Sequence, residues 1–333
     1  MFNTAVAFSS DGSLVAKYHK THLFFEDSYN TPPKVEFVYF DTPFGRLDPG
    51  IQDVVKYGVQ TMVFPTYWGD ELPFRSAKQL QEGWATTNRV NLLAANVLNL
   101  MTGSIGSGIY SGENGPIVYS DITTKTAKLF VADIPINSHN TSASCLSKRF
   151  NKTVSIESLK TDSEYKSMEM NTTGLTLKKL VDKQNSSVVC DNGFCCQLNY
   201  SVVSELSLRD ESYWLFVVNS SAHQNYPMCE ETCGVFRCDD DTCQSFPTKS
   251  KTVFKSLRLS AKFTTNYTYP SLTSNDLTLV PKQYWIYENN GQIGSEVKLN
   301  LENFDKPLLA MALYGRCYDK DLPPPYKFNH TFE

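Results

Sequence analysis

Residues 14–27 read L-V-A-K-Y-H-K-T-H-L-F-F-E-D. The apolar start of this stretch is typical of a β-strand, and it runs into a histidine, Lys20 and then an aromatic pair. Residues 4–8 show a second short strand pattern, and a Ser-Asp-Gly sequence at 10–12 provides a turn between the two. The sequence therefore predicts a β-hairpin that ends just before Lys20.

Strand and helix patterns alternate downstream of this hairpin to about residue 138. Asp48 followed by Pro49 is a typical helix start, and Ala77, Leu80 and Trp84 repeat at helical spacing, with Trp84 expected in the core. The expected strands are residues 35–40, 61–64 (ended by Pro65), 90–95, 108–111 and 116–119. This alternation predicts layers of helix and sheet.

The rest of the chain has a different character. Residues 139–157 are rich in Ser, Asn and Thr and are interpreted as a linker. Residues 158–333 contain short strand patterns separated by turns, such as 253–263, 277–280 and 308–314. We therefore expect a first domain over residues 1–138 and a second, β-rich domain over residues 158–333.

Composition limits the classes of function. The chain has 333 residues, of which 41% are hydrophobic, and a net charge of -4. No basic patch stands out, so a nucleic-acid partner is not expected. There is no apolar run long enough for a transmembrane segment. The amino-terminal residues lack the basic and apolar regions of a signal peptide, so a missing leader and an amino-terminal truncation are expected.

Nine cysteines all lie at or after Cys145. Most of them cluster closely along the chain, which favours disulfides in an oxidising compartment. A zinc site is disfavoured, because the cysteines within each pair are further apart than in a zinc knuckle. The adjacent Cys195 and Cys196 should pair with different partners, although spacing alone leaves the connectivity open. Because nine is odd, one thiol should remain free or pair with another chain. The disulfide candidates are Cys190, Cys195, Cys196, Cys229, Cys233, Cys238 and Cys243, while Cys145 and Cys317 stand isolated.

Acceptor sites for N-glycosylation also gather in the later part of the chain. The eight Asn-x-Ser/Thr sites are Asn140, Asn151, Asn171, Asn185, Asn199, Asn219, Asn266 and Asn329. None occurs before Asn140, and this one-sided distribution favours genuine glycosylation. Together with the cysteines, it predicts an extracellular protein, either secreted or held at the cell surface.

Several sequence blocks carry a family resemblance. Besides the Lys20 segment, they are Asp41-Thr-Pro-Phe-Gly-Arg46, residues 61–68 (T-M-V-F-P-T-Y-W), residues 84–96, residues 190–200 (C-D-N-G-F-C-C-Q-L-N-Y) and residues 313–320 (L-Y-G-R-C-Y-D-K). In this order they resemble the vanin and biotinidase branch of the nitrilase superfamily. The resemblance implies an α+β chain, in which an incomplete α-β-β-α nitrilase sandwich precedes a β-rich, disulfide-bearing base domain.

The resemblance also implies catalytic chemistry. Enzymes of this family cleave amides with a Glu–Lys–Cys triad, in which a thiolate attacks, a glutamate moves protons and a lysine stabilises the oxyanion. Lys20 matches the lysine. The nucleophile's elbow should follow Arg46, but only three residues separate Gly45 from Pro49, and a five-residue strand alone spans roughly 17 Å. The glutamate should precede the hairpin. Two of the three triad groups are therefore expected to be absent.

Three aromatic residues are candidates for a substrate pocket. Tyr67 and Trp68 follow a strand end, where this fold lines its pocket, although Trp68 fits equally well as a capping aromatic. Tyr110 could border the same site, or the glycines near it could simply permit a tight turn. A metal site is not expected: His19 and His22 fit better as separately bonded histidines, and Asp239 to Asp241 fit better as a solvated loop.

Two interpretations of function follow. The first is a secreted hydrolase of a linear amide, such as pantetheine or a biotinyl amide, without a cofactor, for which this sequence is an incomplete gene product. The alternative is a non-catalytic pseudoenzyme that serves as an extracellular binding or interaction protein. A GPI anchor or another carboxyl-terminal extension is compatible with either and is not visible in the chain. A longer transcript that restores a cysteine after Arg46 would decide for the enzyme.

Overall fold

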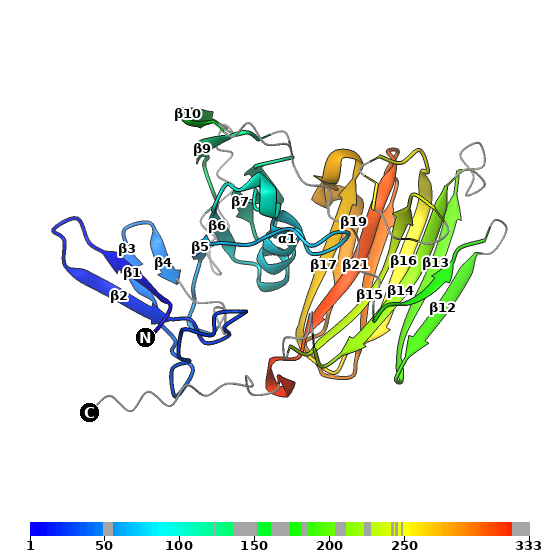
Figure 1. Cartoon of the computed structure of the whole chain (residues 1–333), viewed down its shortest axis with the longest axis horizontal. Helices are drawn as coiled ribbons and strands as arrows, with labels where there is room; N and C mark the ends of the chain where they lie inside the picture. Colours follow the sequence, from blue (N-terminus) through cyan, green and yellow to red (C-terminus); the bar gives the residue numbers. More distant parts are fainter. Residues whose placement is uncertain are drawn as a thin grey trace.

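The computed structural model shows two regions joined along one helix (Figure 1). The described residues are 1–48, 56–122, 124–135, 174–181, 185–203, 211–222, 228–240, 243, 246–247 and 249–321, together with the backbone of 152–160. Within these residues, no helix combines the length and hydropathy needed to span a lipid bilayer. The α+β class predicted from the sequence is confirmed, with a sheet-rich, disulfide-bearing second region.

The described residues of the first region form an amino-terminal hairpin, a mixed sheet, a separate two-stranded sheet and the helix α1 (Ala77–Asn88). The hairpin consists of β1 (Thr4–Phe8) and β2 (Leu14–His19). The sheet has the order β3 (Phe40–Thr42), β4 (Gly45–Asp48), β5 (Thr61–Thr66), β6 (Asn91–Asn96), β7 (Gly108–Ser111) and β8 (Gly115–Tyr119). β4, β5 and β6 run parallel, and the outer pairs are antiparallel.

The hairpin forms as its sequence predicts. The turn places Gly12 at a φ of +84°, a conformation that favours glycine. The Asp11 carboxylate accepts a 2.9 Å hydrogen bond from the Ser13 backbone N–H, which closes the turn locally. Turn and strands depend only on neighbouring residues, which explains why the sequence located them well.

The expected strand over residues 35–40 is wrong for residues 35–39. β3 begins only at Phe40, and the ring of Phe37 packs at a tilt against Tyr57, with 5.3 Å between ring centroids. Glu36 accepts hydrogen bonds from the backbone N–H of His19 and pairs with its ring, so it contacts the end of β2 through its side chain. The run has a strand-like composition, but among the described residues no strand lies beside it to complete a ladder.

Proline does not end β5, contrary to the sequence prediction. The strand continues through Pro65, which pairs with Ala95 of β6. On its other side, β5 pairs with the described residues of β4 only at Thr61 and Met62. Pro65 therefore lies where β5 has one neighbour among the described residues, and its missing N–H is not needed for a second ladder there. The helix expected from Asp48 to about Gly58 falls mostly on residues 49–55, outside the described residues. Residues 56–58 form a turn, and Asp48 itself is the last residue of β4.

The predicted linker is partly strand. β9 (Thr126–Val131) pairs antiparallel with β10 (Lys152–Lys160), so residues 152–157 extend a two-stranded sheet. Residues 136–151 lie outside the described residues.

Two antiparallel sheets make up the second region. One has the order β11 (Thr176–Lys179), β14 (Ser212–Ser220), β15 (Glu230–Cys238), β21 (Leu308–Arg316), β17 (Tyr267–Ser274) and β18 (Thr278–Leu279). The other has the order β12 (Ser186–Asp191), β13 (Phe194–Val202), β16 (Phe254–Lys262), β20 (Glu296–Glu302) and β19 (Trp285–Glu288).

The described residues also form short 3-10 turns. One, η1 (Leu100–Thr102), lies in the first region, and the others lie in the second: η2 (Asn275–Leu277), η3 (Lys282–Tyr284) and η4 (Tyr318–Lys320).

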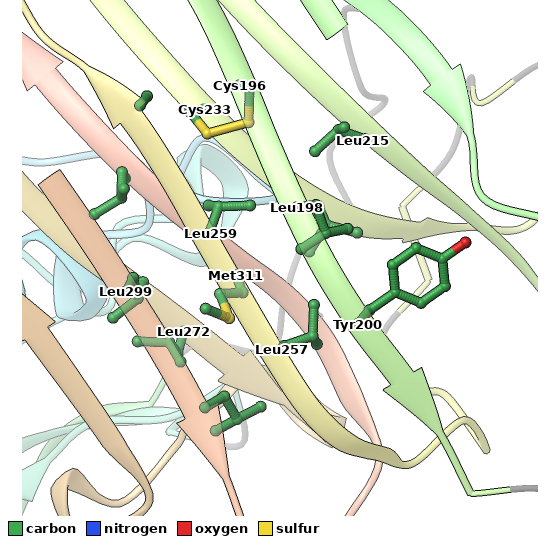
Figure 2. Close-up of a cluster of buried hydrophobic side chains, with 14 of the residues drawn as sticks. Cys196, Leu198, Tyr200, Leu215, Cys233, Leu257, Leu259, Leu272, Leu299 and Met311 are labelled. Carbon is green, nitrogen blue, oxygen red and sulfur yellow. A yellow bond between two sulfur atoms is a disulfide. The ribbon is translucent and has the colours of Figure 1, made fainter. Parts of the chain in front are cut away.

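The two sheets enclose a continuous apolar core (Figure 2). Alternate residues of β13 face it, including Leu198 and Tyr200, while the residues between them face solvent. Leu259 of β16 and Met311 of β21 meet in this core, and both are fully buried. A fully buried side chain of this size contributes about 1.5–3 kcal/mol, so this core is the main stabilising feature of the region.

Helix α1 lies between the first region's sheet and β17 of the second region (Figure 1). Ser76 caps its start and forms a reciprocal capping box with Gln79. The Gln79 side chain also donates to Ser271 of β17 at 2.8 Å. Gly83 comes so close to β17 that an added Cβ would lie 2.5 Å from the Pro270 carbonyl oxygen. The two regions therefore meet in direct backbone contact along α1.

Candidate functional site

Lys20 lies directly after β2 and is held in an ion pair. Its ammonium nitrogen donates to Glu26 Oε2 at 2.5 Å, and its backbone N–H donates to the Asn3 carbonyl at 2.9 Å. The other carboxylate oxygen, Glu26 Oε1, accepts from Asn3 Nδ2 at 2.5 Å. The loop after β2 therefore folds back so that one carboxylate links the lysine to the start of the chain.

The sequence reasoning missed Glu26 as the partner of Lys20. Glu26 lies within the quoted stretch 14–27, six residues beyond the lysine, but no helical or strand spacing connects the two. The pair is partly open, since the side chains are 39% exposed for Lys20 and 22% for Glu26. An ammonium group in such a position can stabilise a developing oxyanion, and the carboxylate can accept a proton.

The two histidines near Lys20 have separate partners. His19 Nδ1 lies 2.9 Å from Glu36 Oε2. The ring of His22 packs against Tyr318 of η4, with 4.5 Å between ring centroids, and burial, reinforced by Arg316, lowers the pKa of His22. Among the described residues, no group of three or more His, Cys, Asp or Glu side chains is arranged to hold a metal ion. The His22 contact places the Lys20 loop against the second region.

Tyr67 and Trp68 lie just beyond β5 and behave differently. Tyr67 is 57% exposed, with its hydroxyl 3.2 Å from Thr102 Oγ1. Trp68 is half-buried, and its indole N–H donates to the Arg75 carbonyl at 3.2 Å. The side chain of Asn96 holds the Trp68 backbone from both sides, by accepting from its N–H and donating to its carbonyl. Trp68 is thus fixed by polar contacts, and Tyr67 faces outward.

Tyr110 lies inside the core and is 0% exposed. Burial raises the pKa of its hydroxyl well above the usual value, and that hydroxyl has no hydrogen-bond partner among the described residues. Its ring packs beneath Gly108 of the same strand, which has no Cβ to occupy that space. Tyr110 is therefore surrounded by protein, whereas Tyr67 is open to solvent.

Two charged residues of α1 share this buried environment, and the sequence reasoning missed both. Lys78 and Glu82 are four residues apart, a spacing that usually indicates an exposed ion pair. Instead they are 0% and 2% exposed, and Lys78 Nζ and Glu82 Oε1 have no hydrogen-bond partner among the described residues. Burial raises the pKa of Glu82 to about 8 and lowers the pKa of Lys78. Only the packing of α1 between two sheets reveals this burial.

The described cysteines are all paired in disulfides, which confirms the prediction of a disulfide-bearing region. The pairs are Cys190–Cys195, Cys196–Cys233, Cys229–Cys317 and Cys238–Cys243, with Cα atoms 4.0 to 5.2 Å apart. As expected, Cys195 and Cys196 have different partners. Cys317, which stands apart from the other cysteines in the sequence, is bonded to Cys229 from 88 residues away, because β15 and β21 are neighbours. Cys145 lies outside the described residues.

Four of the acceptor asparagines can be placed. Asn185, Asn199 and Asn266 are exposed, whereas Asn219 is half-buried and donates to the Asn192 carbonyl at 3.3 Å. The remaining sites, Asn140, Asn151, Asn171 and Asn329, lie outside the described residues.

Comparisons with known proteins cover nearly the whole chain. Residues 1–95 match the carbon-nitrogen hydrolase family, and residues 159–321 match the vanin C-terminal domain. The pantetheinase of Mus musculus is 31% identical over 342 residues, which cover 96% of this chain and 63% of the mouse protein. The biotinidase of Homo sapiens is 30% identical over 363 residues, which cover 96% of this chain and 64% of that protein. The chain thus spans less than two thirds of the length of these relatives.

Proposed function

The chain belongs to the vanin and biotinidase branch of the carbon-nitrogen hydrolase superfamily, and we propose that its parent activity is the hydrolysis of a linear amide. Pantetheine and biotinyl amides are the candidate substrates, in keeping with the names of the relatives. The proposal involves no metal or cofactor. Its support is the ordered match of both regions and the position of Lys20 at the end of β2.

Amide cleavage by this route needs a nucleophile, a base and an oxyanion contact. A thiolate attacks the amide carbonyl, a carboxylate takes the thiol proton and later activates water, and an ammonium group stabilises the oxyanion. Lys20 is the candidate for the oxyanion contact, and its pairing with Glu26 holds the ammonium group in place. Tyr67 and Trp68 remain candidates for the wall of the substrate pocket, whereas the burial of Tyr110 favours a role in packing.

We further propose that residues 1–333 do not themselves turn over substrate. The observation that carries this proposal concerns sulfur: no cysteine precedes Cys145, and every described cysteine is held in a disulfide. A disulfide sulfur cannot act as the attacking thiolate. Loss of the nucleophile normally removes most of an enzyme's rate and leaves only binding and oxyanion contributions.

An assay of thiol release from pantetheine tests this second proposal. Residues 1–333 are expressed behind an added signal peptide, and the purified protein is assayed beside its Lys20→Ala and Lys17→Ala variants. Lys17 is an exposed residue of β2 and serves as the control. We expect no turnover from any of the three. Turnover that Lys20→Ala abolishes and Lys17→Ala preserves would contradict the proposal.

The second candidate function is a non-catalytic extracellular binding protein. The observation that favours it is the set of exposed apolar side chains on the β1–β2 hairpin, which are Val6, Phe8, Leu14 and Val15. Full-length transcript sequencing distinguishes the two candidates: a cysteine encoded after Arg46 supports the enzyme. Saturable binding of pantetheine in calorimetry, without turnover and without such a transcript, supports the binding protein.

We also propose that the protein passes through the secretory pathway and reaches the cell surface or the extracellular space. The disulfides and the exposed acceptor sites Asn185, Asn199 and Asn266 support this location, since thiols stay reduced in the cytosol. A GPI anchor is included in the proposal only as one way in which the protein could be held at the cell surface. Site-resolved mass spectrometry of the secreted protein tests it, and unmodified asparagines at all three sites would contradict it.

A further inference from the structure

A hollow of about 520 Å³ opens where the two regions meet. One side is formed by the end of α1, with Thr86, Thr87 and Arg89, and by the turn between β7 and β8. The other side belongs to the second region and includes Tyr287 and Asn289. This volume lies within the range of about 300–1,000 Å³ that small-molecule sites occupy. We name this hollow the seam cleft.

An N-glycosylation acceptor forms part of the wall of the seam cleft. Asn266 lines it and begins the sequence Asn266-Tyr267-Thr268. The Thr268 carbonyl accepts hydrogen bonds from Thr87 Oγ1 of α1 at 3.1 Å and from the Tyr287 hydroxyl at 2.7 Å. The acceptor is therefore held in place by both regions, although its own side chain is exposed.

The chemistry of the cleft fits a carbohydrate. Sugar hydroxyls both donate and accept hydrogen bonds, and polar side chains of both regions line the cleft, among them Thr87, Arg89 and Lys282. The hydroxyl of Thr87 donates to the Thr268 carbonyl, and its oxygen can still accept a hydrogen bond from a sugar hydroxyl. Tyr287 adds an aromatic ring, whose hydroxyl is already hydrogen-bonded to the Thr268 carbonyl.

The other exposed acceptors lack this setting. Asn185 precedes β12, and Asn199 lies on the solvent face of β13. Neither is among the residues that line the seam cleft. A glycan at those positions extends from the second region alone, so the two sites provide internal controls.

We propose that the core sugars of an N-linked glycan on Asn266 occupy the seam cleft and hold the two regions together. The inference rests on the secretory-pathway location proposed above. In the modification, the Asn266 amide nitrogen bonds to the anomeric carbon of the sugar and loses one proton, and the lipid-linked pyrophosphate of the donor leaves. Thr87 of α1 and Arg89, the residue after the helix, contact the sugars from the first region, and the ring of Tyr287 contacts them from the second.

Endoglycosidase digestion of the native secreted protein tests the proposal directly. Residues 1–333 are produced behind a signal peptide with high-mannose glycans, and release is followed at each site by mass spectrometry. We expect release at Asn266 to be at least tenfold slower than at Asn185 and Asn199, and equal to them after denaturation. Equal rates in the native protein would overturn the inference.

Occupancy in the same experiment separates this inference from the location on which it rests. If Asn185 and Asn199 carry glycans and Asn266 does not, the seam-cleft inference fails and the secretory location stands. If none of the three is modified, both fail.

A stability cycle provides the second test. Asn266→Gln should lower Tm by about 2–4 °C, a shift of the size that small stability changes cause in chains of this length, whereas Asn185→Gln should leave Tm unchanged. Thr87→Val removes a hydroxyl of the cleft wall with little change of shape. It should lower Tm more when Asn266 is glycosylated than in the Asn266→Gln background, which measures the cost of losing its bond to Thr268 alone. Additive effects of the two substitutions would count against the proposed contact.

Discussion

The two regions of this protein both contain antiparallel strands, but they differ in how completely the apolar faces of those strands are buried. In the second region, two antiparallel sheets face each other, and alternate side chains of strands such as β13 and β20 fill a shared core. In the first region, the β1–β2 hairpin leaves Phe8 and Leu14 more than half exposed. Meanwhile α1 buries charged residues such as Lys78 and Glu82. The comparison shows that a strand pattern stabilises a fold only when a second layer covers it.

The largest difference between the two regions should appear in how much stability is lost when a leucine is replaced by alanine. Leu259→Ala empties a fully buried position between two sheets and should lower the free energy of unfolding by about 2–5 kcal/mol. Leu14→Ala removes the same atoms from a residue that is 53% exposed, and it should change stability by less than about 0.5 kcal/mol. Urea unfolding of the two variants measures both values. Similar losses would show that the hairpin is covered in solution.

Removal of the disulfide between the two sheets should have the next largest effect. Cys196 of β13 is bonded to Cys233 of β15, and the two are 37 residues apart. Replacing both with alanine should cost about 3–4 kcal/mol by the loop-entropy relation. The same change at Cys190 and Cys195, which are five residues apart, should cost only about 2 kcal/mol. Thermal unfolding of the two double variants compares these losses of stability. A larger loss for the Cys190 and Cys195 variant would contradict the role assigned to the longer loop.

The buried carboxylate of the first region should make stability depend on pH. Glu82 has a pKa of about 8 in the folded protein, against 4.5 for the hydrated carboxyl group in the unfolded chain. The folded state therefore holds this proton more tightly, so stability should fall as pH rises from about 4.5 to 8, by at most about 1.4 kcal/mol per pH unit. Glu82→Gln should flatten this dependence.

The matched control for this titration is Glu113→Gln, since Glu113 is exposed in the turn between β7 and β8. Chemical denaturation at several pH values reports the slope for each variant. A slope that persists in Glu82→Gln would assign the pH dependence to other groups.

Substitutions on the β1–β2 hairpin should have the smallest effect on stability but a measurable effect on association between chains. Phe8→Ser and Leu14→Thr replace facing, exposed apolar residues of β1 and β2 and should change the free energy of unfolding only slightly. They should, however, reduce concentration-dependent association, because exposed apolar strands invite pairing with other chains. Light scattering over a concentration series measures this, with Lys17→Gln as the control on the same hairpin. A wild-type protein that stays monomeric throughout would contradict the expectation.

The sequence located features that depend on near neighbours. The β1–β2 hairpin, the helix built on Ala77, Leu80 and Trp84, and the β7–β8 hairpin all form close to their expected bounds. Trp84 is buried, as its helical spacing predicted. The different partners of Cys195 and Cys196 also followed from local geometry, because adjacent cysteines are poorly placed to bond to each other. The ordered sequence blocks were likewise sufficient to identify the family.

Tertiary structure decided whatever depends on residues far apart in the chain. Residues 35–39 have a strand-like composition but no neighbouring strand among the described residues. Pro65 stays within β5, where the described part of the chain pairs with only one edge of the strand. Cys317 found Cys229 only because β15 and β21 lie side by side. The Lys78 and Glu82 spacing indicated an exposed face, yet α1 is covered on both sides. Sequence periodicity records which face of an element is apolar, whereas the packing of distant elements determines which faces water can reach.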